Sequence, residues 1–429
     1  MSFACLVERR VEPVLRSFLE TFRVVALVGP RQAGKTTLAR QVTNGGVYLS
    51  LDDPDVLGAA VADPVGFVAG RPRPVVIDEV QRGGDELVRA VKLAVDEVPE
   101  AGSFLLTGST NLLTVPNLSE SLAGRMGLIE LAPFSQAEAG GVESRGLMAW
   151  LADNVASTGR GGGDWYEPLL GMPASLVSRR SYVERICAGG YPEVLRLDGG
   201  QRPAFLRSLL TSIVARDIQE ISGARRITEL SRVAEALAAR TSGELVVADV
   251  HRDTAFGSSQ TTADYVAYLE MVYLTVSLPA WATSAATRVK RRAKVHMADT
   301  GMAAAMLGLT TDALVDPLEP MRGPLHETFA AVEVRKQVSF AATGATLHHF
   351  RDRRGREIDL IVRLPTGKLI CIEVTAAMRA HGTKARTLGW FRDTIGDRFE
   401  LGIVLYAGPL PLRLGPRLVA LPISYLWEI

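Results

Sequence analysis

Residues 29–36 contain two glycines, a lysine and a threonine at the spacing that wraps nucleotide phosphates. Gly29 and Gly34 allow backbone angles that other residues avoid, so the N–H groups of this loop can turn inward onto an anion. Lys35 would reach the β- and γ-phosphates, and the hydroxyl of Thr36 would ligate Mg²⁺. The predicted nucleotide-binding residues are Gly29, Pro30, Arg31, Gln32, Ala33, Gly34, Lys35, Thr36 and Thr37.

Two adjacent carboxylates form the second half of the predicted site. Asp78 and Glu79 follow an apolar segment and would lie at the carboxyl end of a buried strand, where open α/β sheets bind ligands. Asp78 would hold Mg²⁺, and Glu79 would orient or deprotonate the attacking water. The chain has no Asn-Lys-x-Asp segment of the kind that reads guanine. We therefore predict ATP and Mg²⁺ as cofactors and ATP hydrolysis as the reaction.

Three more polar residues are candidates for this site. Thr107 and Ser109 end the next apolar segment, where a hydroxyl can sense the γ-phosphate or position water; ordinary turn chemistry is the alternative. Arg125 precedes a further apolar segment. Supplied to the γ-phosphate of a neighbouring subunit, it would act as an arginine finger, and a solvated surface arginine is the alternative.

The elements that must position these residues are strands alternating with helices. The predicted strands are residues 23–28, 47–51, 74–78, 103–107 and 127–131. A helix would begin at Thr36, so its N-terminus would face the phosphates. This alternation predicts an α/β fold with a parallel sheet.

Bulk composition limits the remaining functions. The 429 residues carry a net charge of +1, so polyanion binding would need a local basic patch. The three cysteines are far apart, fit no zinc spacing and suit a reducing cytoplasm. No apolar run approaches the roughly 18 residues of a membrane span. We expect a cytoplasmic protein without a membrane partner.

Many segments, in order and over nearly the whole chain, resemble bacterial and archaeal AAA-like P-loop ATPases with a C-terminal domain of unknown function. The matching segments include GPRQAGKTTLA (29–39), VVIDEVQR (75–82), SLAGR (121–125), GGYPEV (189–194), ADTGM (298–302) and REIDLIV (356–362). The resemblance implies an ATPase core, a winged-helix-like unit and a fold similar to restriction endonucleases. It also supports Arg125 as the finger and places Asp53 near the nucleotide.

The resulting division of the chain has four parts. Residues 1–138 are the predicted ATPase core, and 139–180 are a flexible insertion or linker with a glycine-rich stretch at 157–164. Residues 181–300 would hold a helical lid and the winged-helix-like unit, and 301–429 the nuclease-like domain.

The middle unit contains a candidate nucleic-acid contact. Residues 245–256 and 261–274 would form two helices around a turn at 257–259. The basic hairpin at 288–294 would follow and contact phosphates. The alternatives are a lid that contacts protein and a merely solvated hairpin.

Three acids of the C-terminal part are similar to the metal site of PD-(D/E)xK nucleases. Asp359 and Glu373 lie on two apolar segments, and Glu327 lies on an upstream helix. Carboxylates of this kind hold Mg²⁺. The nuclease pattern has a lysine at the position where this chain has Thr375, and its absence puts catalysis in doubt. Lys384, on a following helix, is a conjectural substitute.

The leading interpretation is an Mg²⁺-dependent ATPase that switches between conformations and acts as a homo-oligomer, with nucleic acid as a candidate target. One alternative is an ATP-gated DNA-binding or regulatory protein with negligible turnover. A further alternative, an ATP-dependent nuclease, is disfavoured by Thr375.

Overall fold

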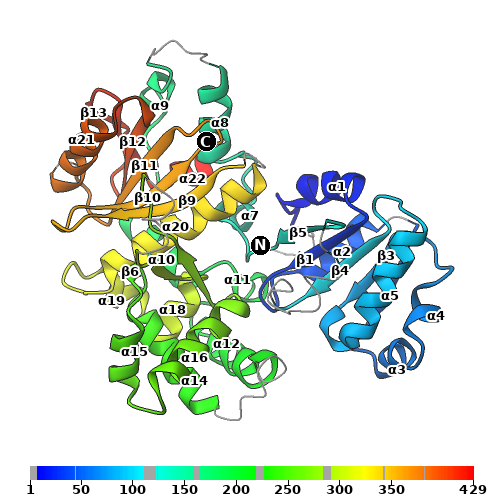
Figure 1. The fold of residues 1–429 in the computed structure, drawn as a ribbon. Helices are drawn as coiled ribbons and strands as arrows, with labels where there is room; N and C mark the ends of the chain where they lie inside the picture. Colours follow the sequence, from blue (N-terminus) through cyan, green and yellow to red (C-terminus); the bar gives the residue numbers. More distant parts are fainter. Residues whose placement is uncertain are drawn as a thin grey trace.

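The structure is a computed structural model that describes residues 7–43, 45–110, 122, 124–157, 164–218, 227–283, 291–341, 344–380 and 382–429. Figure 1 shows two lobes: a smaller N-terminal lobe in blue and cyan, and a larger lobe formed by the rest of the chain. None of the described helices is long and apolar enough to cross a membrane.

The N-terminal lobe is built on a parallel sheet of five strands in the order β2-β3-β4-β1-β5. The strands are β1 Val24–Val28, β2 Val47–Ser50, β3 Val75–Asp78, β4 Phe104–Gly108 and β5 Met126–Glu130. All five predicted strands are present, and the predicted α/β fold with a parallel sheet is confirmed.

Helices cover both faces of this sheet (Figure 1). They are α1 Glu12–Thr21, α2 Lys35–Val42, α3 Pro54–Ala62, α4 Pro64–Val68 and α5 Gly84–Glu97, with a 3-10 turn η1 at Val80–Gly83. Alternate residues of β1 enter opposite cores, because successive side chains of a strand point to opposite faces. Ala26 packs into the core under α5, and Val25 packs into the core that contains Leu15 of α1 and Leu38 of α2.

The segment 139–180, which we expected to be a flexible insertion or linker, contains helices where the structure describes it. It contributes the end of α7 (Gln136–Gly140), α8 (Leu147–Ser157) and α9 (Glu167–Leu170). Leu151 and Leu169 are buried in the core of the larger lobe, so burial of apolar side chains orders this region. Residues 158–163 of the glycine-rich stretch lie outside the described residues.

The middle of the chain is helical, with a small antiparallel sheet of order β6-β8-β7. Its elements are α10 Arg179–Ala188, α11 Pro192–Leu195, α12 Arg202–Ser212, the π-helix η3 Ile213–Asp217, α14 Ile227–Ala238, β6 Gly243–Glu244, α15 Val247–Thr254, α16 Ser259–Met271, β7 Thr275–Leu278 and β8 Lys294–Met297. The helices predicted at 245–256 and 261–274 are present as α15 and α16. Of the basic hairpin predicted at 288–294, residues 288–290 lie outside the described residues.

The C-terminal part forms a mixed sheet of six strands in the order β13-β14-β12-β11-β10-β9. Its strands are β9 Thr346–Arg351, β10 Glu357–Arg363, β11 Leu369–Thr375, β12 Phe399–Tyr406, β13 Leu412–Gly415 and β14 Leu418–Pro422. Its helices are α18 Thr300–Met306, α19 Thr311–Val315, α20 Arg322–Phe340, α21 Thr383–Ile395, the 3-10 turn η4 Gly396–Arg398 and α22 Tyr425–Glu428.

The long helix α20 joins the two lobes. Arg335 forms an ion pair of 2.5 Å with Glu130 at the end of β5. One residue further on, Lys336 donates a 2.9 Å hydrogen bond to the carbonyl of Phe134. Glu333 is buried and accepts a 3.1 Å bond from the backbone of Gln136. The second half of α20 is therefore fixed to the chain that leaves the nucleotide-binding sheet.

Candidate nucleotide-binding site

The loop between β1 and α2 requires glycine at both predicted positions. Gly29 has φ of 148°, and a Cβ there would lie 2.2 Å from the carbonyl oxygen of Leu131. Gly34 has φ of 98° and directly precedes α2, so it allows the loop to turn into the helix. The N-terminus of α2 then points at the loop, where its backbone N–H groups can bind a phosphate.

The predicted lysine of this loop lies inside it. Lys35 is 5% exposed, and its Nζ donates hydrogen bonds of 2.9 Å each to the carbonyls of Gly29 and Pro30. The ammonium group is therefore held where phosphates would enter the loop.

Asp78 gathers three hydroxyl donors around one buried carboxylate. Thr36 donates a 2.9 Å hydrogen bond to its Oδ2, as expected for two residues that share a metal ion. Tyr48 donates to the same oxygen, and Thr107 donates to Oδ1. Burial and the neighbouring Asp78 raise the pKa of Tyr48 to about 12, so Tyr48 stays a donor. These hard oxygen atoms are ligands that suit Mg²⁺.

Glu79 has a left-handed backbone conformation, with φ of 55°. Its Oε2 accepts bonds of 2.6 Å from Gln81 and 3.3 Å from the hydroxyl of Ser109. These contacts hold the carboxylate near the tip of β4, and Glu79 lines the cavity described next. The structure thus places the predicted pair Glu79 and Ser109 in direct contact.

A cavity of about 380 Å³ lies over the loop. The N-terminal lobe supplies Val7, Arg9, Arg31, Gln32, Gly34, Lys35, Thr36, Thr37, Leu38, Gln41, Glu79 and Phe134 to its lining. The larger lobe supplies Ala139, Pro192, Glu193, Leu195 and Arg196. No residue of this second group was predicted to bind the nucleotide, although Pro192 and Glu193 belong to the segment GGYPEV (189–194). A nucleotide in this cavity would contact both lobes.

Arg9 is a further residue that sequence reasoning missed. Its guanidinium is buried and donates 2.7 Å hydrogen bonds to the carbonyls of Ala33, in the loop, and of Ala132. It also pairs with Glu138 at 3.0 Å and lies over the ring of Phe134. Arg9 therefore joins the phosphate-binding loop to the segment that leaves β5, and nothing in the local sequence around Arg9 and Arg10 indicates these distant contacts.

Two residues carried over from the family resemblance lie elsewhere. Arg125 immediately precedes β5, at the edge of the sheet where β1 begins, whereas the loop follows the end of β1. It forms a bidentate pair with Asp96 at 2.6 and 3.0 Å. Asp53 caps α3 by accepting bonds from Asp55 and Val56, and it does not line the cavity.

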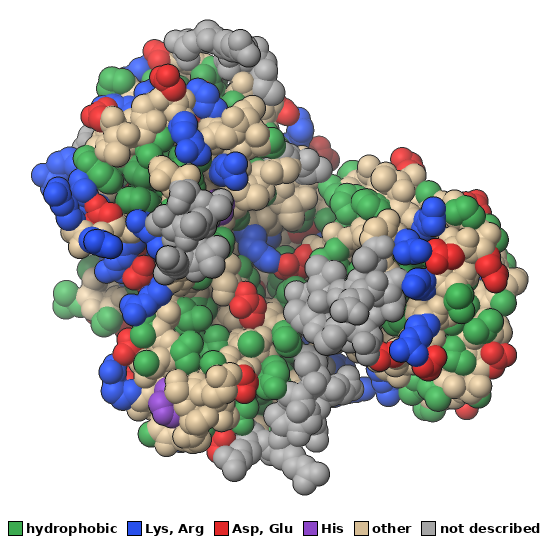
Figure 2. Space-filling model, viewed as in Figure 1, with side chains coloured by type: hydrophobic (Ala, Val, Ile, Leu, Met, Phe, Trp, Pro, Cys, Tyr) green, Lys and Arg blue, Asp and Glu red, His purple; other side chains and the backbone are tan. Residues whose placement is uncertain are grey.

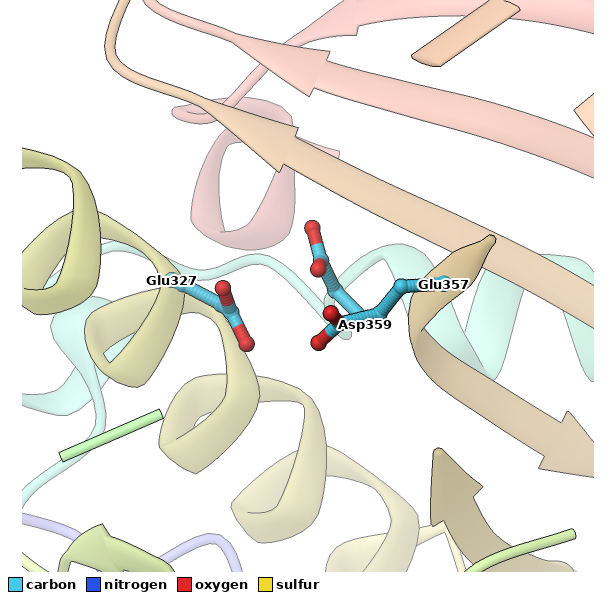
Figure 3. Close-up of side chains that lie close together, drawn as sticks. All are labelled: Glu327, Glu357 and Asp359. Atoms are coloured by element: carbon cyan, nitrogen blue, oxygen red, sulfur yellow. The ribbon is translucent and has the colours of Figure 1, made fainter. Parts of the chain in front are cut away.

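The acids predicted for a second metal site do meet in the C-terminal part. Glu327 on α20 and Asp359 on β10 lie close to Glu357, which was not among the predicted acids (Figure 3). Each of these three residues has a carboxylate oxygen within 4.8 Å of the others. Glu373 on β11 is buried beside them, on the far side of Asp359.

Two lysines fill this acid–lysine cluster, which we define as Lys294, Glu327, Glu357, Asp359, Glu373 and Lys384. Lys294 begins β8 of the middle unit and is almost completely buried. Its Nζ lies 2.6, 2.5 and 3.5 Å from Glu327, Glu357 and Asp359. Lys384 from α21 closes the other side, 2.7 Å from Asp359 and 2.6 Å from Glu373.

The protonation of this cluster follows from burial and from the two ammonium groups. Burial and the charge of Asp359 raise the pKa of Glu327 to about 8, and burial raises that of Glu373 well above its usual value. Burial opposes ionisation of Asp359 too, but Lys384 and Lys294 lower its pKa to about 2. Because the Nζ of Lys294 already lies among the three carboxylates of Figure 3, the residues present do not fit a divalent ion there.

The fold and the phosphate-binding loop define a P-loop ATPase. Residues 21–140 match the AAA domain family, and residues 179–313 and 322–426 match the domains of unknown function DUF8612 and DUF4143. Uncharacterized proteins of Mycobacterium bovis and Mycobacterium tuberculosis are 30% identical over 363 residues, which span 84% of this chain and 72% of each relative. The chain belongs to this family of AAA-like P-loop ATPases with a C-terminal domain of unknown function.

Solved structures give weaker likenesses. A Walker-type ATPase of Pyrococcus abyssi is 15% identical, with a TM-score of 0.39 over 70% of this chain and 96% of that one. A signal transduction ATPase with numerous domains and a tetratricopeptide repeat sensor, from Pyrococcus horikoshii, has a TM-score of 0.26 at 11% identity, over 79% and 48%. At these scores neither likeness carries a structural argument.

Proposed function

We propose that this protein binds and hydrolyses ATP with Mg²⁺ and uses the nucleotide as a switch between its two lobes. The observation that carries the proposal is the cavity of about 380 Å³, where Lys35, Thr36 and Glu79 meet residues of the larger lobe. Lys35 and the N-terminus of α2 would bind the phosphates. Thr36 and Asp78 would hold Mg²⁺, which would neutralise phosphate charge when bound with the nucleotide.

Glu79 is the residue that we propose to orient the attacking water. Its carboxylate is fixed by Gln81 and Ser109 and lines the cavity beside the phosphate loop. A carboxylate in this place can accept a proton from water as the water attacks the γ-phosphate. Ser109 would hold Glu79 in this orientation through its hydroxyl.

The switch follows from the position of α11. Pro192, Glu193 and Leu195 line the cavity opposite the phosphate loop, and they belong to the larger lobe. A bound nucleotide would add contacts between the lobes, and hydrolysis would remove those made through the γ-phosphate. A ligand that contacts two bodies in one state shifts their relative arrangement by its difference in affinity.

The test is ATP hydrolysis by the purified full chain and by its Glu79→Gln variant. We expect the variant to bind ATP normally and to hydrolyse it about 10²–10⁴-fold more slowly, because a positioned general base is lost. Glu86→Gln, on the exposed face of α5, is the matched control. Hydrolysis that survives Glu79→Gln would refute the role of Glu79. Binding without turnover by the wild-type chain would instead favour the ATP-gated regulatory protein that the sequence left open.

For Arg125 we propose a role in a neighbouring subunit of a homo-oligomer. Its place at the edge of the sheet opposite the loop prevents it from reaching the γ-phosphate of its own chain. Neither the Arg125→Ala chain nor the Lys35→Ala chain should hydrolyse ATP alone. A mixture of the two should, because the intact nucleotide site of an Arg125→Ala chain can then meet the intact Arg125 of a Lys35→Ala chain across an interface. Full activity of Arg125→Ala alone would remove the finger role and leave a surface pair with Asp96.

For the acid–lysine cluster we propose a structural role in place of nuclease catalysis. Lys384 does occupy the neighbourhood that Thr375 leaves without a lysine, since it contacts Asp359 and Glu373. The position among Glu327, Glu357 and Asp359, however, holds the ammonium of Lys294. Metal-dependent nicking of plasmid DNA that disappears in Asp359→Ala would overturn this assignment.

A further inference from the structure

Four aromatic rings form a contiguous cluster on the β9 side of the C-terminal sheet. Phe350 of β9 lies 5.0 Å from Phe391 and 6.1 Å from Trp390, both on α21. Trp281, which follows β7 of the middle unit, lies 5.6 Å from Phe391 and 6.4 Å from Phe350. The cluster therefore combines residues from two parts of the chain that are distant in sequence.

Three arginines from three separate segments lie over these rings. Arg356 has its guanidinium 3.4 Å from the centroid of Trp390. Arg398 lies 5.4 Å from the centroid of Trp281, and Arg291 lies 5.8 Å from that of Phe350. A guanidinium that rests on an aromatic face is attracted by the ring and loses side-chain freedom.

Hydrogen bonds fix two of these arginines further. Arg291 donates a 2.8 Å bond to the carbonyl of Arg351, which ties the end of the basic hairpin to β9. Arg356 donates a 2.7 Å bond to Asp352. Asp352 also accepts hydrogen bonds from the backbone N–H groups of Arg354 and Arg356. Its carboxylate therefore stabilises the turn between β9 and β10, whose exposed side chains include arginines.

More arginines lie on the solvent side of these rings. Arg292 is exposed, and so are Arg351, Arg353 and Arg354 at the turn between β9 and β10. Figure 2 shows lysine and arginine side chains gathered on this flank of the larger lobe, where the turn projects in Figure 1. We call this the arginine platform; its members are Arg291, Arg292, Arg351, Arg353, Arg354, Arg356 and Arg398.

We propose that the arginine platform binds the phosphate backbone of a nucleic-acid duplex. Guanidinium groups present paired donors that match phosphate oxygens, and pre-orientation on aromatic rings lowers the cost of each contact. Glu244 and Glu357 lie 3.7 Å from Arg351, and Asp352 pairs with Arg356, so the seven arginines keep a local excess of positive charge in a chain whose net charge is only +1. A membrane surface fits less well, because the large hydrophobic residues exposed in the described part of the chain lie outside these segments.

This inference goes beyond the proposed ATPase and does not depend on it. The platform lies on the C-terminal sheet and the adjoining end of the hairpin, whereas the nucleotide cavity lies over the loop after β1. The same binding is therefore expected of the Lys35→Ala chain, with and without ATP.

The experiment measures binding of the full chain to a short labelled DNA duplex by fluorescence anisotropy, at several salt concentrations. We expect affinity that falls steeply with salt, with a slope of about −0.9 for each phosphate contacted. Arg353→Glu with Arg354→Glu should weaken binding at least about tenfold and make the slope less steep by about two. Both residues are exposed in the turn, so the substitutions should not affect folding.

The matched control is Arg207→Glu with Arg232→Glu, which makes the same change of charge on the exposed faces of α12 and α14. It should keep nearly all of the affinity. An equal loss in both double variants would show a nonspecific effect of net charge and overturn the proposal. The absence of salt-dependent duplex binding would overturn it too, as would platform-dependent binding to anionic lipid vesicles alone.

Discussion

The nucleotide cavity and the acid–lysine cluster use the same kinds of residue in opposite ways. Both place carboxylates on buried strands of a sheet and bring a buried lysine to within hydrogen-bond distance of oxygen atoms. At the nucleotide site, the ammonium of Lys35 contacts neutral carbonyl groups and faces a cavity of about 380 Å³. In the cluster, the ammonium of Lys294 contacts three carboxylates.

The difference shows that carboxylates and lysines form a binding site only where part of their charge is not neutralised by each other and a cavity can hold the ligand. Lys35 and the N-terminus of α2 leave positive potential that a triphosphate can neutralise. The four carboxylates and two lysines of the cluster neutralise one another to a large extent, with Glu327 and Glu373 shifted toward protonation. Removing one partner of a buried ion pair is strongly destabilising, because it leaves an uncompensated buried charge. The paired groups therefore stabilise the fold and have little charge left to bind a ligand.

The largest difference between the two sites is expected when their lysines are replaced, first at Lys35. Lys35→Ala should abolish measurable ATP binding, because each charge-assisted contact to a phosphate contributes about 1.5–3 kcal/mol. The chain should still fold, since the sheet and the helices that carry the loop have their own apolar cores, so the loss of binding can be separated from unfolding. Calorimetric titration with ATP and urea denaturation measure the two quantities. Near-normal ATP affinity would show that the cavity is not the nucleotide site.

The converse outcome is expected at Lys294. Lys294→Met should lower the unfolding free energy by about 3–5 kcal/mol, because buried carboxylates lose their partner. ATP affinity of the folded fraction should not change. Adding Glu327→Gln should recover part of the stability, since one orphaned carboxylate is then neutral. A stable Lys294→Met chain that binds Mn²⁺ at Glu327 and Asp359 would contradict the structural role.

A smaller effect concerns pH. Because the pKa of Glu327 rises to about 8 from a usual value of 4.5, the folded chain holds this proton between those values while the unfolded chain has lost it. The stability contribution is therefore greatest below pH 4.5 and is lost as the pH rises to about 8, by at most about 1.4 kcal/mol per pH unit. Glu327→Gln should reduce the measured slope, with Glu373 contributing what remains, as measured by denaturation at pH 6 and 7. An unchanged slope would assign it to other groups.

The sequence predicted the phosphate loop and the five strands well, because their causes are local. Gly29 and Gly34 require special backbone angles, and the buried strands are short apolar runs bounded by turns. Glu79 and Ser109 were also found separately from local order, since each follows an apolar segment, but their contact was not predicted.

The remaining features depend on contacts between distant segments. Arg9 reaches Ala33 and Glu138, and Lys294 reaches Glu357, across separations that no spacing rule connects. The segment 139–180 was expected to be flexible because of its glycines, but Leu151 and Leu169 are buried by a partner surface that comes from later in the chain. Long-range burial of this kind cannot be predicted from one local pattern.

The helix α20 has a mechanical consequence. Glu327 in its first half belongs to the acid–lysine cluster, and Arg335 in its second half holds Glu130 of the nucleotide-binding sheet. At a rise of about 1.5 Å per residue, these two attachments are about 12 Å apart on one continuous helix. One continuous helix therefore carries both attachments, so a change in the angle of α20 at Arg335 would also move Glu327 relative to Lys294 of β8.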